Sequence, residues 1–272
     1  MGFMKMDAYR LGFVGFGHMA QILCQRIIAA RLIPRSQIQF IQRDTVKMRQ
    51  NEQKYGITST SLKHLVESSD ALFLCVRPGQ MPKLALEMAP FGVASKKILS
   101  ILSGISISFF QKCWGPHVEV VWVMPNVASS IGEGMTTLSF SPDASPEFKS
   151  FTERLVAPFG QFLEVPETQM NTATAVAGSG PGFLFKLIEA MAEAGEKGGL
   201  PSEKALAMAA QTFIGAARLV ASGENLSDLI TGIATPGGTT EAGFQVMKET
   251  AVCEHFQDAI HATIQKAKAL SQ

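Results

Sequence analysis

Two glycine-rich stretches of the sequence carry the residue types that bind anions. In the first, LGFVGFGHMAQ at residues 11–21, Gly15, Gly17 and Ala20 form the spacing G-x-G-x-x-A. The first glycine permits a sharp strand-to-helix turn, the second lets a pyrophosphate approach the backbone, and a small third residue lets the helix lie close to the strand. We expect this loop, with Phe16, His18 and Met19, to bind a dinucleotide pyrophosphate through the free N–H groups of the helix start. The alternative is a glycine-rich turn without a ligand.

The second stretch, Pro236-Gly237-Gly238-Thr239-Thr240, stands at the predicted start of a helix. Consecutive glycines expose backbone N–H groups, and the two threonine hydroxyls add donors beside the helix dipole. Such a nest suits a carboxylate or a phosphate. The pattern fits a helix start with a threonine N-cap and no ligand equally well, and Glu241 would repel an anion unless its side chain points away.

Strand and helix signals alternate along the first part of the chain. Apolar runs bounded by turns predict strands at 11–14, 38–41, 71–76, 97–102 and 118–123, and helical spacing predicts helices at 17–32, 45–55, 61–68 and 83–89. A strand at 132–138, a helix at 147–159 and a strand at 161–165 follow. This order predicts an α/β fold with an N-terminal Rossmann doubly wound parallel sheet.

Three strands end in loops that such a sheet places at its ligand-binding edge. These loops are Gln42-Arg43-Asp44, Arg77-Pro78-Gly79, which follows Val76, and Ser103-Gly104. Arg43 offers a planar cation for the 2′-phosphate of NADP, which favours NADP as the cofactor. Asp44 favours the free 2′-hydroxyl of NAD instead, and Arg43 would then be a solvated charge at a strand end.

The strand signals stop after Pro166, and small residues at helical spacing replace them. We therefore predict a dinucleotide-binding domain at 1–166 and an all-helical domain at 167–272. Its helices are expected at 180–198, at 202–223 with Ser202 as the N-cap, at 225–233, and after TPGGTT towards Gln272. A domain this small and apolar is expected to complete its core against a second subunit, and a monomeric bundle is the alternative.

The composition limits the partners. The 272 residues carry a net charge of +1 and 46% hydrophobic residues, which gives no footprint for nucleic acid or an anionic membrane. No apolar run is long enough to span a membrane. The cysteines form no C-x-x-C pair and the histidines no ligand cluster, so we expect packed thiols, a reducing cytoplasm and no metal site. Residues 1–10 lack a signal-peptide core and are expected to form a loose leader.

Seven motifs, in order, resemble the pyrroline-5-carboxylate reductase family over nearly the whole chain. They are GFVGFGHMA at 12–20, VRP at 76–78, SGI at 103–105, MPN at 124–126, GEGMT at 132–136, GSGP at 178–181 and TPGGTTEAG at 235–243. The resemblance implies reduction of 1-pyrroline-5-carboxylate to L-proline with NAD(P)H. It also implies a Rossmann domain followed by a helical dimerisation domain, and interlocked homodimers that often assemble into decamers.

The resemblance also implies roles for single residues. The N–H groups of Gly238 and Thr239 would hold the substrate carboxylate, with Gly237 in the same loop, and the Thr240 hydroxyl would hydrogen-bond the ring nitrogen. Thr235 and Glu167 would lie nearby. In this family the substrate pocket lies between the nicotinamide and this loop, and a partner subunit usually completes it.

Several positions depart from the family pattern. Arg77 replaces a lysine, Trp122 an arginine, Val127-Ala128 the dipeptide T-P, Leu62 an asparagine and Asn171 an aspartate. These changes leave room for an altered cofactor preference or weakened activity. One rival interpretation is a β-hydroxyacid dehydrogenase, with Lys186 as its catalytic lysine. Another is a nucleotide-binding homologue that has lost catalysis.

Overall fold

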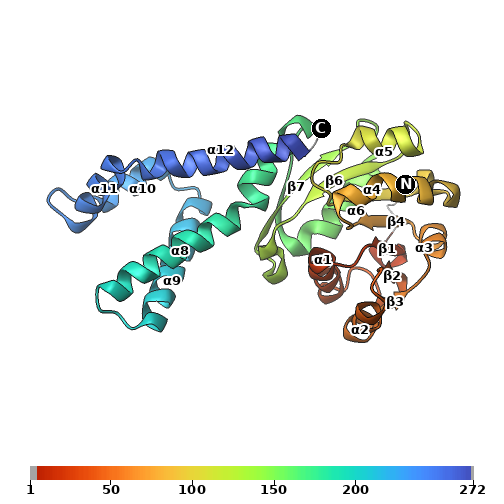
Figure 1. Ribbon diagram of the computed structural model, residues 1–272, viewed down its shortest axis with the longest axis horizontal. Helices are drawn as coiled ribbons and strands as arrows, with labels where there is room; N and C mark the ends of the chain where they lie inside the picture. Colours follow the sequence, from red (N-terminus) through yellow and green to blue (C-terminus); the bar gives the residue numbers. More distant parts are fainter. Residues whose placement is uncertain (1–4, 271–272) are drawn as a thin grey trace. The chain divides into compact units, whose positions relative to one another are not determined.

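The computed structural model describes residues 5–270 (Figure 1). These residues divide into two compact units. The sheet unit comprises the described residues up to Ser179 together with those from Ile264 onward, and the helical unit comprises Gly180–Thr263. The units therefore divide after Ser179, whereas the domain boundary expected from the sequence follows Pro166, and that functional boundary stays a prediction.

Eight strands, counted over residues 5–270, form one sheet in the order β3-β2-β1-β4-β5-β6-β7-β8 (Figure 1). The neighbours are parallel except β6 and β7, which pair antiparallel with Val121 opposite Phe140. The predicted doubly wound α/β sheet is confirmed. The strands are β1 (Leu11–Val14), β2 (Ile38–Ile41), β3 (Thr58–Ser59), β4 (Ala71–Leu74), β5 (Lys97–Ser100), β6 (Val120–Met124), β7 (Gly134–Phe140) and β8 (Gly160–Glu164).

The reversal at β7 is a feature that the strand signals did not reveal. A parallel pair needs a long crossover, but only the short 3₁₀ helix Val127–Ile131 joins β6 to β7. The chain therefore turns back, and β7 enters the sheet in the opposite direction. Helix α6 (Pro146–Val156) then provides the crossover that makes β8 parallel to β7.

The helices of the sheet unit follow the predicted positions closely, apart from two differences and one short addition, α7, which the sequence analysis did not predict. Helix α1 ends at Ala29 rather than Leu32, with Arg31 at a positive φ of 53°. Helix α5 (Ile107–Trp114) has no counterpart in the sequence prediction. The others are α2 (Thr45–Tyr55), α3 (Leu62–Ser68), α4 (Met81–Met88) and α7 (Met170–Ala173), which continues as a π-helical turn at Thr174–Gly178.

The core lies on both faces of the sheet. Phe13 and Phe73 stack on one face with ring centroids 5.2 Å apart, while Val14 and Leu74 belong to the cluster on the other face. Successive strand residues point to opposite faces, so these strands must be apolar throughout. This burial holds the carboxyl ends of the strands in one plane.

The segment before β1 is packed, so the expectation of a loose leader is wrong for residues 5–9. Met6–Ala8 form a 3₁₀ helix, and Met6 and Tyr9 are 4% and 2% exposed. The Tyr9 ring lies 4.4 Å from that of Phe151, and its hydroxyl donates to Glu147 Oε1 at 2.7 Å. Residues 1–4 lie outside the described part.

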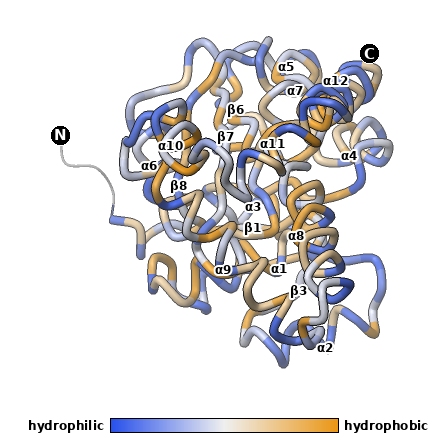
Figure 2. Tube along the Cα trace, turned by 90° about the vertical axis from the view of Figure 1, so that its left-hand side faces the viewer, coloured by the Kyte–Doolittle hydropathy of each residue, from blue (hydrophilic) through white to orange (hydrophobic). Residues whose placement is uncertain are grey.

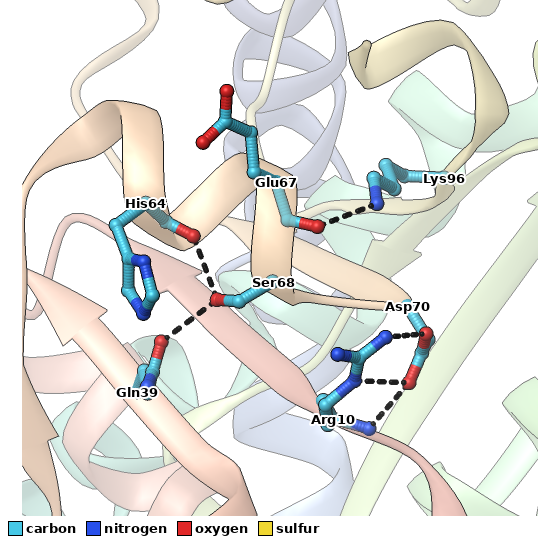
Figure 3. Close-up of polar contacts among 7 residues, drawn as sticks. All are labelled: Arg10, Gln39, His64, Glu67, Ser68, Asp70 and Lys96. Atoms are coloured by element: carbon cyan, nitrogen blue, oxygen red, sulfur yellow. Dashed lines mark hydrogen bonds and ion pairs between the residues drawn. The ribbon is translucent and has the colours of Figure 1, made fainter. Parts of the chain in front are cut away.

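Polar contacts tie the amino ends of the strands together (Figure 3). The Arg10 guanidinium forms an ion pair with Asp70 at 2.8 Å, and the Arg10 backbone N–H donates to the same carboxylate at 2.9 Å. The Arg10 hydrogen bonds hold the pKa of Asp70 below its usual value. The Ser68 hydroxyl lies within hydrogen-bonding distance of Gln39 Oε1 at 3.1 Å. These contacts join the starts of β1, β2 and β4.

The helical unit contains α8 (Gly180–Lys197), α9 (Ser202–Ala221), α10 (Leu226–Ile233), α11 (Thr239–Glu249) and most of α12 (Val252–Leu270). Ala192, Ala205 and Ala209 are buried between α8 and α9, where their small side chains let the two helices pack closely. The last region is two helices because Ala251 turns to a φ of +50°. Ser202 is the first helical residue and donates to Glu196 at 2.6 Å, so the prediction that it caps α9 was wrong.

Large apolar side chains of the helical unit lie exposed in the single chain. Phe185 is 60% exposed and Ile233 61% exposed. Figure 2 shows hydrophobic segments along the trace of α8. A surface of this kind is typical of a protein–protein interface. None of the helices within residues 5–270 has the length and apolar character required to cross a membrane.

Candidate cofactor and substrate site

A cavity of about 520 Å³ opens at the carboxyl ends of β1, β2 and β4. We call it the β1–β4 cavity. It brings together seven of the residues predicted to bind the cofactor, namely Gly15, Phe16, Gly17, Gln42, Arg43, Val76 and Arg77. His18, Met19, Ala20, Pro78, Ser103 and Gly104 are not among the residues that line it. Lys47, Gln80 and Lys83 also line it, and the sequence interpretation did not single them out.

The two glycines of the fingerprint have different surroundings. Gly15 has a φ of +88°, and a Cβ there would lie 2.8 Å from the carbonyl oxygen of Cys75. Gly17 has an ordinary φ of −79°, and no atom lies within 4 Å of the position of its Cβ. Gly15 therefore makes the turn possible, while Gly17 leaves open space beside the backbone.

The other residues of this loop divide between core and surface. Phe16 is 1% exposed and packs against Phe40 and Tyr55, so its side chain belongs to the core. Ala20 is also buried, whereas His18 is exposed. The first N–H groups of a helix lack partners within that helix, and Gly17 as N-cap supplies no side chain. The start of α1 therefore has backbone donors for an anion.

The end of β2 and the start of α2 supply two of the cations that line the cavity. Arg43 and Lys47 are exposed at its rim. The Asp44 carboxylate accepts the N–H groups of Val46 and Lys47 at 3.1 and 3.0 Å, which makes it the N-cap of α2. The hydrogen bond from the Lys47 N–H lowers the pKa of Asp44. The Asp44 carboxylate, whose position at the end of β2 favours NAD, is thus engaged with the start of α2.

The end of β4 contributes a second turn to the cavity. The Arg77 N–H donates to Gln80 Oε1 at 3.2 Å, and Pro78 begins the 3₁₀ helix Pro78–Gln80. Leu62, one of the departures from the family pattern, also lines the cavity. Burial raises the pKa of the Cys75 thiol, so this cysteine stays protonated at the cavity wall.

The cysteines carry no disulfide, and they differ in burial. Cys24 is buried, which raises the pKa of its thiol to about 12. Cys253 is exposed, so the expectation of packed thiols is wrong there. Over residues 5–270, no group of three or more His, Cys, Asp or Glu side chains could hold a metal ion.

The loop after β5 contains Ser103 and Gly104 and ends at the start of α5. The Ser106 hydroxyl accepts the N–H of Phe109 at 3.2 Å, and Glu167 Oε1 accepts the N–H of Ile107 at 2.7 Å. Gly104 has a φ of +82°, and a side chain there would meet the backbone carbonyl of Leu270. The structure therefore places Glu167, predicted to lie near the substrate, at this loop.

The MPN motif joins β6 to the π-helical turn. Asn126 Nδ2 donates to the carbonyl of Ala177 at 2.9 Å, and its Oδ1 accepts the N–H of Ala128 at 3.1 Å. Trp122 is 3% exposed and clusters with Met124 and Met170. Its Nε1 has no hydrogen-bond partner among the described residues. A bulky apolar ring thus occupies the position of the family's arginine.

The second glycine-rich loop lies in the helical unit and forms a tight turn. Gly237 has a φ of +72°, and the Gly238 N–H donates to the Thr235 carbonyl at 2.9 Å. Glu241 Oε2 accepts the N–H of Gly237 at 2.7 Å, so this carboxylate points into the loop and not away from it. Helix α11 begins at Thr239 with Gly238 as its N-cap, and Thr240 is half-buried.

Lys186 does not have the surroundings of a catalytic lysine. It is exposed on α8, and its ammonium donates to Glu189 at 2.6 Å. This hydrogen bond raises the pKa of Lys186 and keeps it charged. The geometry is that of an i,i+3 surface pair, which gives no support to the β-hydroxyacid dehydrogenase interpretation.

A mostly parallel sheet with a glycine fingerprint at the end of β1 and a cavity beside it defines a Rossmann-type dinucleotide-binding protein. Residues 10–104 match the family model described as "NADP oxidoreductase coenzyme F420-dependent", and residues 167–270 match "Pyrroline-5-carboxylate reductase dimerisation".

Relatives extend the match to the whole chain. It is 32% identical to pyrroline-5-carboxylate reductase 1 of Bacillus subtilis over 98% of this chain and 91% of that protein. It is 33% identical to the Aquifex aeolicus pyrroline-5-carboxylate reductase over 96% of this chain and 97% of that protein. The chain belongs to the pyrroline-5-carboxylate reductase family.

Solved structures agree with this assignment. The Plasmodium falciparum pyrroline carboxylate reductase, crystallised with NADP bound, matches with a TM-score of 0.88 at 26% identity, covering 98% of this chain and all of that chain. The Coxiella burnetii pyrroline-5-carboxylate reductase matches with a TM-score of 0.87 at 28% identity over the same shares. The predicted family is confirmed.

Proposed function

We propose that this protein reduces 1-pyrroline-5-carboxylate to L-proline with a hydride from NAD(P)H. The observation that carries the proposal is the full-length similarity to reductases of this name in a chain with an open cavity at its glycine fingerprint. The departures at Leu62, Trp122 and Asn171 leave that fingerprint and Thr240 unchanged.

The cofactor side of the proposal rests on the β1–β4 cavity. The open space at Gly17 and the N–H groups of the α1 start suit a pyrophosphate. We propose NADPH as the preferred cofactor, with Arg43 on the 2′-phosphate, because Asp44 is committed to capping α2. His18, Met19, Ala20, Pro78, Ser103 and Gly104 stay in the proposed cofactor set as parts of the loops that shape this edge.

The substrate side rests on the turn before α11. A cyclic imine with a protonated nitrogen is already electrophilic, so hydride transfer from a bound nicotinamide needs mainly positioning. We assign the substrate carboxylate to the N–H groups of Gly238 and Thr239, and the ring nitrogen to the Thr240 hydroxyl. This assignment requires the Glu241 carboxylate, which accepts the Gly237 N–H, to leave the loop when the substrate binds. The Gly238 N–H also donates to Thr235, so it would be shared between the turn and the ligand. The resemblance adds Thr235, Gly237 and Glu167 to this set.

The proposal extends to the assembly and the location. The match of residues 167–270 to a dimerisation model and the exposed apolar residues of the helical unit support a homodimer, and we propose that such dimers assemble into a decamer. We assign residues 1–166 to the cofactor and residues 167–272 to the substrate and dimerisation. Free cysteines support a cytoplasmic location.

One assay tests the reaction. Purified protein is mixed with NADPH or NADH and with pyrroline-5-carboxylate or a 3-hydroxy acid, and nicotinamide absorbance is followed. Turnover with the imine is expected. Turnover with the hydroxy acid alone would establish the rival dehydrogenase activity, and cofactor binding without turnover would establish a homologue that has lost catalysis.

A further inference from the structure

The loop Ile101–Ser106 is fixed at both ends by contacts from distant parts of the chain. At its start, the Ile101 N–H donates to the carbonyl of Leu74 at 3.2 Å. At its end, the Ile107 N–H donates to Glu167 Oε1 at 2.7 Å across 60 residues of sequence. Between these ends, Gly104 packs against the backbone carbonyl of Leu270. The proposed function assigns Ser103 and Gly104 of this loop to the cofactor.

The contact at Ile107 satisfies a backbone donor that has no partner in its own helix. Ile107 is the first residue of α5, and its N–H lies at the positive end of the helix dipole. Ser106 caps the same helix through the N–H of Phe109, which leaves the Ile107 N–H to another acceptor. A carboxylate is the strongest acceptor for this place because the hydrogen bond is charge-assisted.

The position of Glu167 explains why it can make this contact. It begins a 3₁₀ helix, Glu167–Gln169, directly after Pro166 and the end of β8. Met170 follows and is fully buried against Trp122 and Met124. The backbone at Glu167 is therefore held firmly, and its half-buried side chain reaches α5 from a fixed point.

We propose that Glu167 is a positioning residue that holds the cofactor loop Ile101–Ser106 through the N–H of Ile107. This role replaces the substrate contact that the resemblance implies for Glu167, because its carboxylate is engaged with the Ile107 N–H and acts on NADPH through the loop. This inference rests on the proposed function, because it needs Ser103 and Gly104 to contact the cofactor.

The test compares three variants, Glu167→Ala, Glu167→Asp and Glu167→Gln. Glutamine keeps the acceptor oxygen and the reach, whereas aspartate keeps the charge but is one methylene too short. We expect Ala and Asp to raise the Kd for NADPH, measured by titration without substrate, by about three- to tenfold, the effect of losing a helix cap. Glutamine keeps a neutral acceptor at the same reach, so its Kd is expected to lie closer to wild type than the values for Ala and Asp, and the KM for pyrroline-5-carboxylate at saturating NADPH is expected to stay constant in all three.

The control is Glu153→Ala, which removes an exposed glutamate of α6. A Kd for NADPH that is unchanged in the Ala and Asp variants would overturn the proposal. The proposal would also be overturned if the Gln variant had a raised KM for the substrate while the Asp variant behaved like wild type. That pattern would mean that the negative charge of Glu167 acts on the substrate.

Wild-type protein separates this inference from the proposed function. If it binds NADPH but does not reduce the imine, the proposed substrate is wrong while the titrations of the three variants still decide the role of Glu167. If it binds no NADPH, the proposed function and the inference both fail. Thermal unfolding of each variant shows whether a change in Kd accompanies a loss of the folded structure. The Gln variant keeps an acceptor for the Ile107 N–H and serves as the comparison if the Ala or Asp variant is unstable.

Discussion

Gly15 and Gly17 are two residues apart, and each is glycine for a different reason. Gly15 needs its positive φ and has the Cys75 carbonyl where a Cβ would stand. Gly17 has neither constraint, and the space beside it is open to the β1–β4 cavity. The first glycine is therefore required by the fold, and we assign the second to the proposed ligand.

This difference predicts opposite effects of the same substitution. Gly17→Ala is expected to leave the melting temperature unchanged and to weaken NADPH binding by about tenfold or more, because the methyl group occupies the space of the pyrophosphate. Gly15→Ala is expected to lower the stability by about 1–3 kcal/mol, because the left-handed backbone and the close carbonyl both oppose a Cβ. Thermal unfolding and NADPH titration of both variants measure this. Equal melting temperatures for the two would contradict the assignment.

The Thr240 hydroxyl is assigned to the substrate nitrogen, and this assignment can be tested at one atom. Thr240→Val keeps the shape and removes the hydroxyl, so we expect kcat/KM to fall by about one to two orders of magnitude, since a hydrogen bond to a charged group contributes roughly 1.5–3 kcal/mol. Thr231→Val, on exposed α10, is the matched control. Steady-state kinetics with pyrroline-5-carboxylate are the measurement, and an unchanged kcat/KM would remove Thr240 from the mechanism.

Arg43 is the residue on which the NADPH preference depends. Arg43→Ala is expected to reduce the ratio of kcat/KM for NADPH to kcat/KM for NADH by about tenfold. The substitution removes a charge-assisted contact of roughly 1.5–3 kcal/mol, and Lys47 is expected to replace part of that contact. Lys63→Ala, an exposed lysine of α3, is the control. If the ratio is unchanged in the Arg43 variant, another cation binds the 2′-phosphate.

At the scale of elements, the strands that form the cofactor edge could be predicted from the sequence. Each is a short apolar run that ends in a glycine, proline or polar turn, as at Val14 and Leu74. Helix α5 escaped prediction because three of the residues in its sequence, ISFFQKCW, are aromatic, and aromatic residues favour a helix only weakly. The direction of β7 could not be predicted either, because the periodicity of apolar residues indicates a strand but not its orientation in the sheet.

The candidate site was predictable to a different degree. The glycine loop and Arg43 follow from local spacing, and the structure brings them to one cavity. The contacts of Glu167 with Ile107 and of Glu241 with Gly237 follow from no periodic pattern. A carboxylate that caps a helix or a loop depends on where other segments lie, and a single sequence does not report that.

The ion pair between Arg10 and Asp70 links the starts of β1 and β4 and has a pH dependence of known sign. The pKa of Asp70 is lowered in the folded chain by its hydrogen bonds with Arg10. Its contribution is therefore complete above the unfolded pKa of about 3.9 and is lost as pH falls through the lower folded pKa. Asp70→Asn is expected to cost about 0.2–1 kcal/mol at neutral pH, because the pair is partly exposed.

Urea unfolding of wild type and Asp70→Asn across acid pH measures this link. The two free energies of unfolding are expected to converge below about pH 4. Asp143→Asn, at an exposed turn before α6, is the control. A difference that stays constant through the acid range would mean that the ion pair is not its source.

At the scale of the whole molecule, the apolar surface of the helical unit predicts self-association. Phe185→Asp combined with Leu206→Asp places charges on two exposed apolar positions of α8 and α9. We expect wild type to sediment as a dimer or larger and the double variant to shift towards the monomer, because a desolvated charge opposes association. Lys186→Ala is the control on α8. A double variant of wild-type size would place the interface elsewhere.

The helical unit is inserted into the chain of the sheet unit and does not simply follow it. Because the chain leaves the sheet unit at Ser179 and re-enters it at Ile264, the helical unit is an insertion held by two covalent joints. The final turns of α12 belong to the sheet unit, where Leu270 lies against the loop that contains Gly104. Removal of residues from the carboxyl terminus is therefore expected to weaken nucleotide binding first, before any helix of the helical unit is lost.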